Sequence, residues 1–138
     1  MPGGGVDAGE SIITAGKREC MEEAAMEIEF KGWLALQFYP NSEKHYAKMM
    51  RFVLYAEPLS LEAANNPKNF VDKESDCAEW KTLAELEQLG QDKKLRAPDL
   101  LDWARYLEQG GAIYPMSALG EEGGSGNAAS SASFGIHQ

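Results

Sequence analysis

The feature that most constrains this chain is the spacing of glycine, acidic and basic residues in its first 26 positions. Five residues separate Gly4 from Glu10, and seven separate Glu10 from the charged segment Arg18-Glu19-Cys20-Met21-Glu22-Glu23. Residues 2–9 contain four glycines and a proline, which is the composition of a turn. The chain is therefore expected to begin with a loop and to continue into a charged element.

That charged element is predicted to be a helix that Ser11 caps and that runs to about Met26. At about 100° per residue, Glu19, Glu22 and Glu23 fall within an arc of about 100° on one helix face. Carboxylates this close repel one another unless a cation lies among them. Oxygen-rich clusters suit Mg²⁺ or Mn²⁺ better than zinc. A charge run on its own is more typical of a solvated helix face, which is the competing interpretation.

Downstream residues predict a hairpin and further helices. Residues 28–39 and 49–56 are rich in aromatic and branched residues and indicate two antiparallel strands. The remaining predictions are irregular structure over 61–75, a short strand over 78–81, a helical turn over 83–89 and a final helix over 99–109 that ends at Gly110.

The first 26 residues resemble the Nudix signature, G-x5-E-x7-R-E-U-x-E-E-x-G-U, in which U is a bulky apolar residue. Every defined position fits, with Cys20 accepted as a U residue, except Ala25, where the family has glycine. The order of hairpin, loop, strand and final helix is also Nudix-like. The resemblance implies an α/β fold, a Nudix-type α/β/α sandwich with a mixed β-sheet. The first and last helices would then lie on opposite faces of the sheet.

The resemblance also implies roles for individual residues. The implied metal ligands are the carbonyl of Gly3 and the carboxylates of Glu19, Glu22 and Glu23. Arg18 would bind no metal and would pair with a loop acid such as Glu10, which fixes the loop around Gly4 against the helix. Glu19 and Glu22 would also take part in catalysis.

A further acid is expected a few residues before a tryptophan. Glu74, six residues before Trp80, is the first candidate for the general base or an additional metal ligand, and Glu79 is the second. Glu19 is the other candidate for the base.

The implied activity is Mg²⁺-dependent (or Mn²⁺-dependent) hydrolysis of a diphosphate linkage in a nucleoside diphosphate derivative. Residues 73–75, 78–80 and 95–101 resemble the Nudix branch that acts on oxidised guanine nucleoside diphosphates. The alternative is a Nudix-like binding or regulatory module without turnover, or a fragment. Two features favour that alternative: Ala25 departs from the signature, and no strand precedes the glycine loop, so we expect an N-terminally truncated domain.

Composition limits the partners. The formal net charge of −9 argues against nucleic-acid binding, and no apolar run is long enough to cross a bilayer. Two cysteines cannot form a disulfide framework, so a cytoplasmic location is expected.

Residues 1–115 are predicted to form the Nudix domain and residues 116–138 a disordered tail rich in Gly, Ser and Ala. An unpaired sheet edge could pair two copies of the chain into a homodimer.

Overall fold

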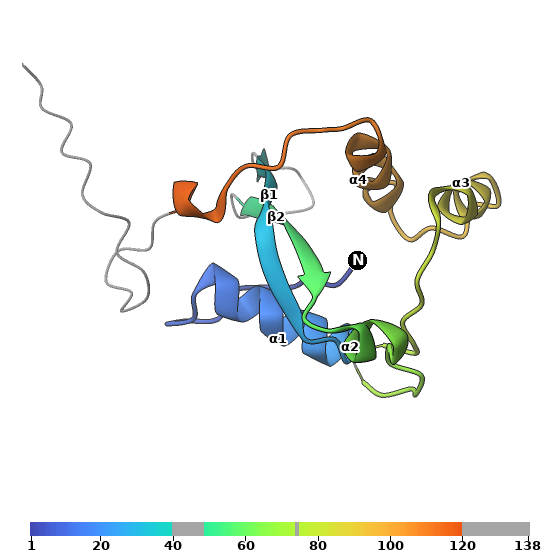
Figure 1. Cartoon of the computed structure of the whole chain (residues 1–138), viewed down its shortest axis with the longest axis horizontal. Helices are drawn as coiled ribbons and strands as arrows, with labels where there is room; N and C mark the ends of the chain where they lie inside the picture. Colours follow the sequence, from blue (N-terminus) through green and yellow to red (C-terminus); the bar gives the residue numbers. More distant parts are fainter. Residues whose placement is uncertain (40–48, 74, 120–138) are drawn as a thin grey trace, which may run out of the picture.

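The computed structural model of the chain describes residues 1–39, 49–73 and 75–119. Its elements in chain order are α1 (Ile12–Ala24), β1 (Ile28–Tyr39), β2 (Met49–Pro58), α2 (Leu61–Asn65), α3 (Leu83–Gln91), α4 (Asp99–Glu108) and the short 3₁₀ helix η1 (Met116–Ala118). The predicted α/β class is confirmed. Among the described residues, the sheet consists of β1 and β2, which run antiparallel (Figure 1).

Helix α1 begins where the sequence predicts. The Ser11 hydroxyl accepts a hydrogen bond from the Thr14 amide at 3.0 Å, which satisfies one of the free N–H groups at the helix start. The helix ends at Ala24, two residues earlier than predicted, because Ala25 has a φ of 50° in the left-handed region.

Helix α1 packs against β1, and α4 packs against α3 and is linked to β2 by one ion pair, so the placement of the two helices on opposite faces of the sheet stays a prediction. A Cβ at Gly16 of α1 would lie 2.6 Å from the Phe30 ring, so this glycine lets β1 pack directly against the helix backbone. Phe30 is opposite Ala56 in the sheet, whereas Arg51 of β2 lies an odd number of residues away from Ala56 and projects from the other face. Arg51 pairs there with Asp99 at the start of α4.

The chain beyond the hairpin departs from prediction in two places. Residues 78–81 were expected to be a strand, but they are irregular and pair with no strand in the described part of the chain. They lack a neighbouring strand edge, without which an extended segment has no ladder to join. Residues 61–65, expected to be irregular, form α2, which Ser60 caps through a bond to the Ala63 amide.

The last two helices were placed correctly. Helix α3 is longer than the predicted turn and starts with a capping box between Thr82 and Glu85. Helix α4 ends at Glu108, close to the prediction, and Gly110 follows with a φ of 75°. No helix in the described ranges has both the length and the apolar content for a membrane crossing. The predicted boundary at residue 115 stays a prediction, and residues 120–138 lie outside the description.

Candidate active site

One arginine organises the N-terminal loop and the charged helix. The Arg18 guanidinium donates from Nε to Glu10 Oε1 and from Nη2 to Glu10 Oε2, both at 3.0 Å, so the pair is bidentate. Nη2 also donates to the Gly5 carbonyl at 3.0 Å. These bonds hold the pKa of Glu10 below its usual value and raise that of Arg18. The loop is thereby fixed to the helix, as the resemblance implies.

The same guanidinium gathers two carboxylates of the helix. Its Nη1 donates to Glu19 Oε1 at 2.7 Å and to Glu22 Oε2 at 3.1 Å. The Glu19 side chain is 15% exposed and that of Glu22 is 42% exposed, so Glu19 is the more enclosed of the two. A Cβ at Gly4 would lie 2.3 Å from Glu19 Oε1, so a side chain at this position would displace the Glu19 carboxylate from its present place.

The Glu23 side chain contacts Gly3, the loop residue whose carbonyl is an implied metal ligand. Its Oε2 accepts a hydrogen bond from the Gly3 amide at 3.1 Å. The structure thus brings Gly3 and Gly4 against Glu23 and Glu19 respectively, and it places Glu22 beside Glu19 through Arg18. The four residues that the resemblance implies as metal ligands, Gly3, Glu19, Glu22 and Glu23, lie along the interface between the loop and α1, which we call the seam.

The donor chemistry of this seam fits a hard divalent cation. Carboxylate and carbonyl oxygens are its only candidate ligands, the set that Mg²⁺ and Mn²⁺ prefer. In the described part of the chain, however, no three acidic, histidine or cysteine side chains converge into a ready metal cluster. Instead, Arg18 Nη1 lies between the carboxylates of Glu19 and Glu22 and pairs with both.

The C-terminal end of α1 is held by a distant loop that the sequence did not single out. Lys68 is 2% exposed, and its Nζ donates to the Glu22 carbonyl at 2.9 Å and to Asp72 Oδ1 at 2.6 Å. The Ser75 hydroxyl donates to the Glu23 carbonyl at 2.7 Å. A lysine in a polar loop looks like a solvated residue in sequence, so nothing there signals its burial.

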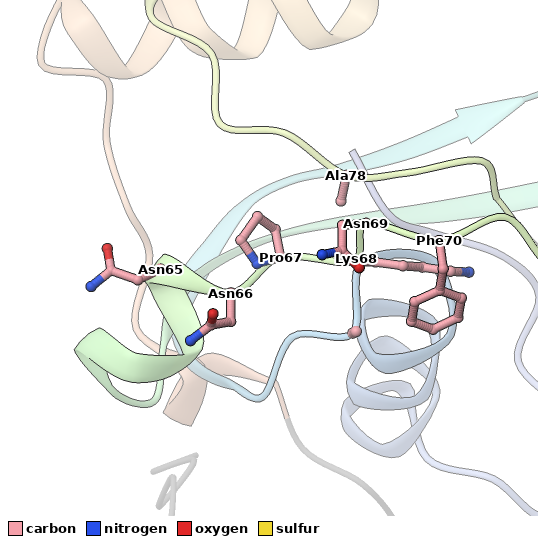
Figure 2. Close-up of a pocket in the computed structure, with 8 residues that line it drawn as sticks. Asn65, Asn66, Pro67, Lys68, Asn69, Phe70 and Ala78 are labelled. Carbon is pink, nitrogen blue, oxygen red and sulfur yellow. The ribbon is translucent and has the colours of Figure 1, made fainter.

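Lys68 also borders a hollow of about 350 Å³ between α2 and the end of α1. Figure 2 shows Lys68 and Phe70 side by side over the blue helix α1, and the Lys68 ammonium lies 5.2 Å from the Phe70 ring centroid. In this view Asn65 and Asn66 lie on the far side of Pro67 from Lys68, whereas Asn69 lies next to Lys68.

Two of the three candidate general bases, Glu19 and Glu79, lie in the described part of the chain. Glu74 lies outside the described residues, so its prediction is untested. Glu79 is exposed and pairs with Lys81, away from the Arg18 network. Burial, together with the nearby Glu23 carboxylate, raises the pKa of Cys20, which agrees with a packing role for this thiol. Glu19 is therefore the one candidate base that the described structure brings into the seam.

Comparison with known proteins now identifies the family. No curated protein matches the chain. The family model of the NUDIX domain matches residues 1–104, which include the loop, α1, the hairpin and the first part of α4. This match supports a hydrolase that acts on pyrophosphate bonds of small nucleotide derivatives. The chain belongs to the NUDIX domain family.

Proposed function

We propose that this protein is a Mg²⁺- or Mn²⁺-dependent pyrophosphohydrolase that cleaves the diphosphate linkage of a nucleoside diphosphate derivative. The observation that supports this most is the Arg18 network, in which one guanidinium binds Glu10, Glu19 and Glu22. A solvated helix face has no need of such a bridge to a glycine loop. The network therefore favours a built site over a simple charged surface.

Glu19, Glu22, Glu23 and the Gly3 carbonyl would hold the cation. When bound, it would neutralise the diphosphate, which a chain of net charge −9 otherwise repels, and would make a bound water more acidic. Glu19, or Glu74 from the loop, would take the proton of the water that attacks phosphorus. Arg18 and Glu10 would hold the loop and the carboxylates in fixed relative positions.

The substrate class proposed is an oxidised guanine nucleoside diphosphate, on the resemblance of residues 73–75, 78–80 and 95–101. We propose a cytoplasmic location as well, because both cysteines are free. The competing module without turnover drew support from Ala25. Its backbone nevertheless takes the left-handed conformation that glycine adopts readily, so this departure does not alter the course of the chain.

The test is turnover of an oxidised guanine nucleoside diphosphate, a sugar nucleotide, a dinucleoside polyphosphate and coenzyme A, with and without excess chelator. Glu22→Gln should lower turnover by orders of magnitude while the protein stays folded. Glu27→Gln, which removes one exposed carboxylate outside the Arg18 network, is the matched control and should leave turnover unchanged. Full turnover in chelator, or equal losses in both variants, would refute the proposed function.

A further inference from the structure

The last turn of α1 is completed by donors from one loop. A helix leaves its last four carbonyls without partners inside the helix. In α1 the Met21 carbonyl accepts from the Ala25 amide at 3.0 Å. The next three carbonyls, those of Glu22, Glu23 and Ala24, accept from Lys68 Nζ, Ser75 Oγ and the Lys68 amide respectively, at distances of 2.9, 2.7 and 2.9 Å. Lys68 and Ser75 thus satisfy the three carbonyls that the helix itself leaves open.

The chemistry of these donors goes beyond ordinary capping. Lys68 is the single buried charged residue in the described part of the chain. A buried ammonium requires a partner for its charge, and Asp72 Oδ1 supplies it at 2.6 Å. Asp72 Oδ1 in turn accepts from the Ser75 amide at 3.1 Å. The lysine, the aspartate and the serine therefore form one unit that cannot shift without moving the backbone of Glu22 and Glu23.

We propose that Lys68 is a positioning residue that sets the affinity of the Glu22–Glu23 turn for a divalent cation. The inference rests on the proposed function. Lys68 contacts the backbone of this turn and not its carboxylates, so it acts through geometry: it fixes the carbonyls, and with them the directions in which the two carboxylates leave the helix. Partners behind metal ligands commonly change metal affinity by about 10–100-fold when removed.

The loss of charge and the loss of ligand orientation should change the affinity for a cation in opposite directions. The direction of the measured change therefore distinguishes the two effects. Removing a positive charge near a cation site strengthens cation binding by Coulomb attraction alone. Removing a group that orients the ligands weakens it. We expect Lys68→Met to weaken Mn²⁺ binding about tenfold, measured by titration calorimetry well below the melting temperature of each variant. Lys94→Met, at an exposed lysine whose only described ion pair is with Asp92, is the control for charge and should not weaken binding.

Two further variants distinguish the proposed role of Lys68 from a loss of folding and from a purely structural role. Ser75→Ala removes the donor to the Glu23 carbonyl without leaving a buried charge, and should weaken Mn²⁺ binding several-fold in a folded protein. Lys68→Arg keeps the charge and hydrogen-bond donors in a larger, planar group and should bind Mn²⁺ more tightly than Lys68→Met. A tenfold higher Mn²⁺ concentration should restore the turnover of Lys68→Met, which a generally damaged fold would not allow.

The outcomes are distinct. Unchanged or tighter Mn²⁺ binding in both Lys68→Met and Ser75→Ala would overturn the inference while the proposed function stands. Wild-type protein that neither binds Mn²⁺ nor cleaves a diphosphate would refute both. Weaker binding in both variants, with rescue by Lys68→Arg and by added Mn²⁺, would establish Lys68 as the positioning residue.

Discussion

Replacing Ala25 by glycine should stabilise the protein. Ala25 ends α1 with a φ of 50° and a ψ of 39°, and its amide donates to the Met21 carbonyl at 3.0 Å. An L-residue in this left-handed conformation has its Cβ too close to the following carbonyl oxygen, which costs roughly 1–2 kcal/mol. Glycine has no Cβ and adopts the conformation without that strain.

The net gain follows from two opposing effects. Removing the strain stabilises the folded state by roughly 1–2 kcal/mol. The more flexible glycine stabilises the unfolded chain by roughly 0.4–1 kcal/mol. The methyl group of Ala25 borders the open hollow beside α2, so little packing is lost with it. We expect a gain of about 1 kcal/mol in the free energy of unfolding, which is a rise of about 3–5 °C in melting temperature at this chain length.

Thermal and urea unfolding of the full chain would measure this gain. Ala24→Gly is the matched control: Ala24 is the last residue of the helix and is buried, so glycine there should lower the melting temperature. An Ala25→Gly protein with the same or lower stability than wild type would show that the left-handed residue is not strained.

Three other predictions concern acid stability, the tail and self-association. The Arg18 bond lowers the pKa of Glu10, so this carboxylate contributes stability above the ordinary glutamate pKa of 4.5 that is lost as the pH falls through the lowered value; Glu10→Gln should flatten the acid side of a pH–stability profile, and an unchanged slope would contradict this. Deleting residues 120–138 should leave the melting temperature unchanged, because that segment has few apolar residues to bury; a clear drop would show that it docks. Phe38 and Met50 lie opposite each other in the sheet at 59% and 62% exposure, so the chain should self-associate in sedimentation, and Phe38→Lys with Met50→Glu should shift it to monomer without loss of secondary structure.

Local signals in the sequence were sufficient for the first helix and its partner loop. Ser11 marks the helix start, and the spacing of Glu10 and Arg18 predicts the pair that joins loop to helix. Both features depend on residues fewer than ten positions apart, so one stretch of sequence contains all the groups involved. The hairpin was predictable for the same reason, because its aromatic and branched residues indicate strands wherever they pack.

Features that depend on distant contacts were not predictable. The strand expected over residues 78–81 has no neighbouring strand to join in the described part of the chain. Helix α2 is a different case, because its cap at Ser60 is local but the segment has no helical periodicity. The burial of Lys68 depends on a carbonyl 46 positions earlier in the chain. Sequence patterns describe local preference, and such a bond becomes visible only when the hairpin has brought the two segments together.

The support of α1 from residues 68–75 also bears on the order of folding. The bonds from Lys68 and Ser75 to α1 span 46 and 52 residues, and the chain between α1 and Lys68 includes both strands. Contacts of such long sequence separation form late, because loop closure must precede them. The first turns of α1 can form from local interactions, but its last turn reaches its final geometry only after β1 and β2 have paired and returned the chain at Pro58 to Ile28. A partly folded chain therefore presents Glu22 and Glu23 without their backbone support, so the metal binding that we propose would be acquired late and would report complete folding.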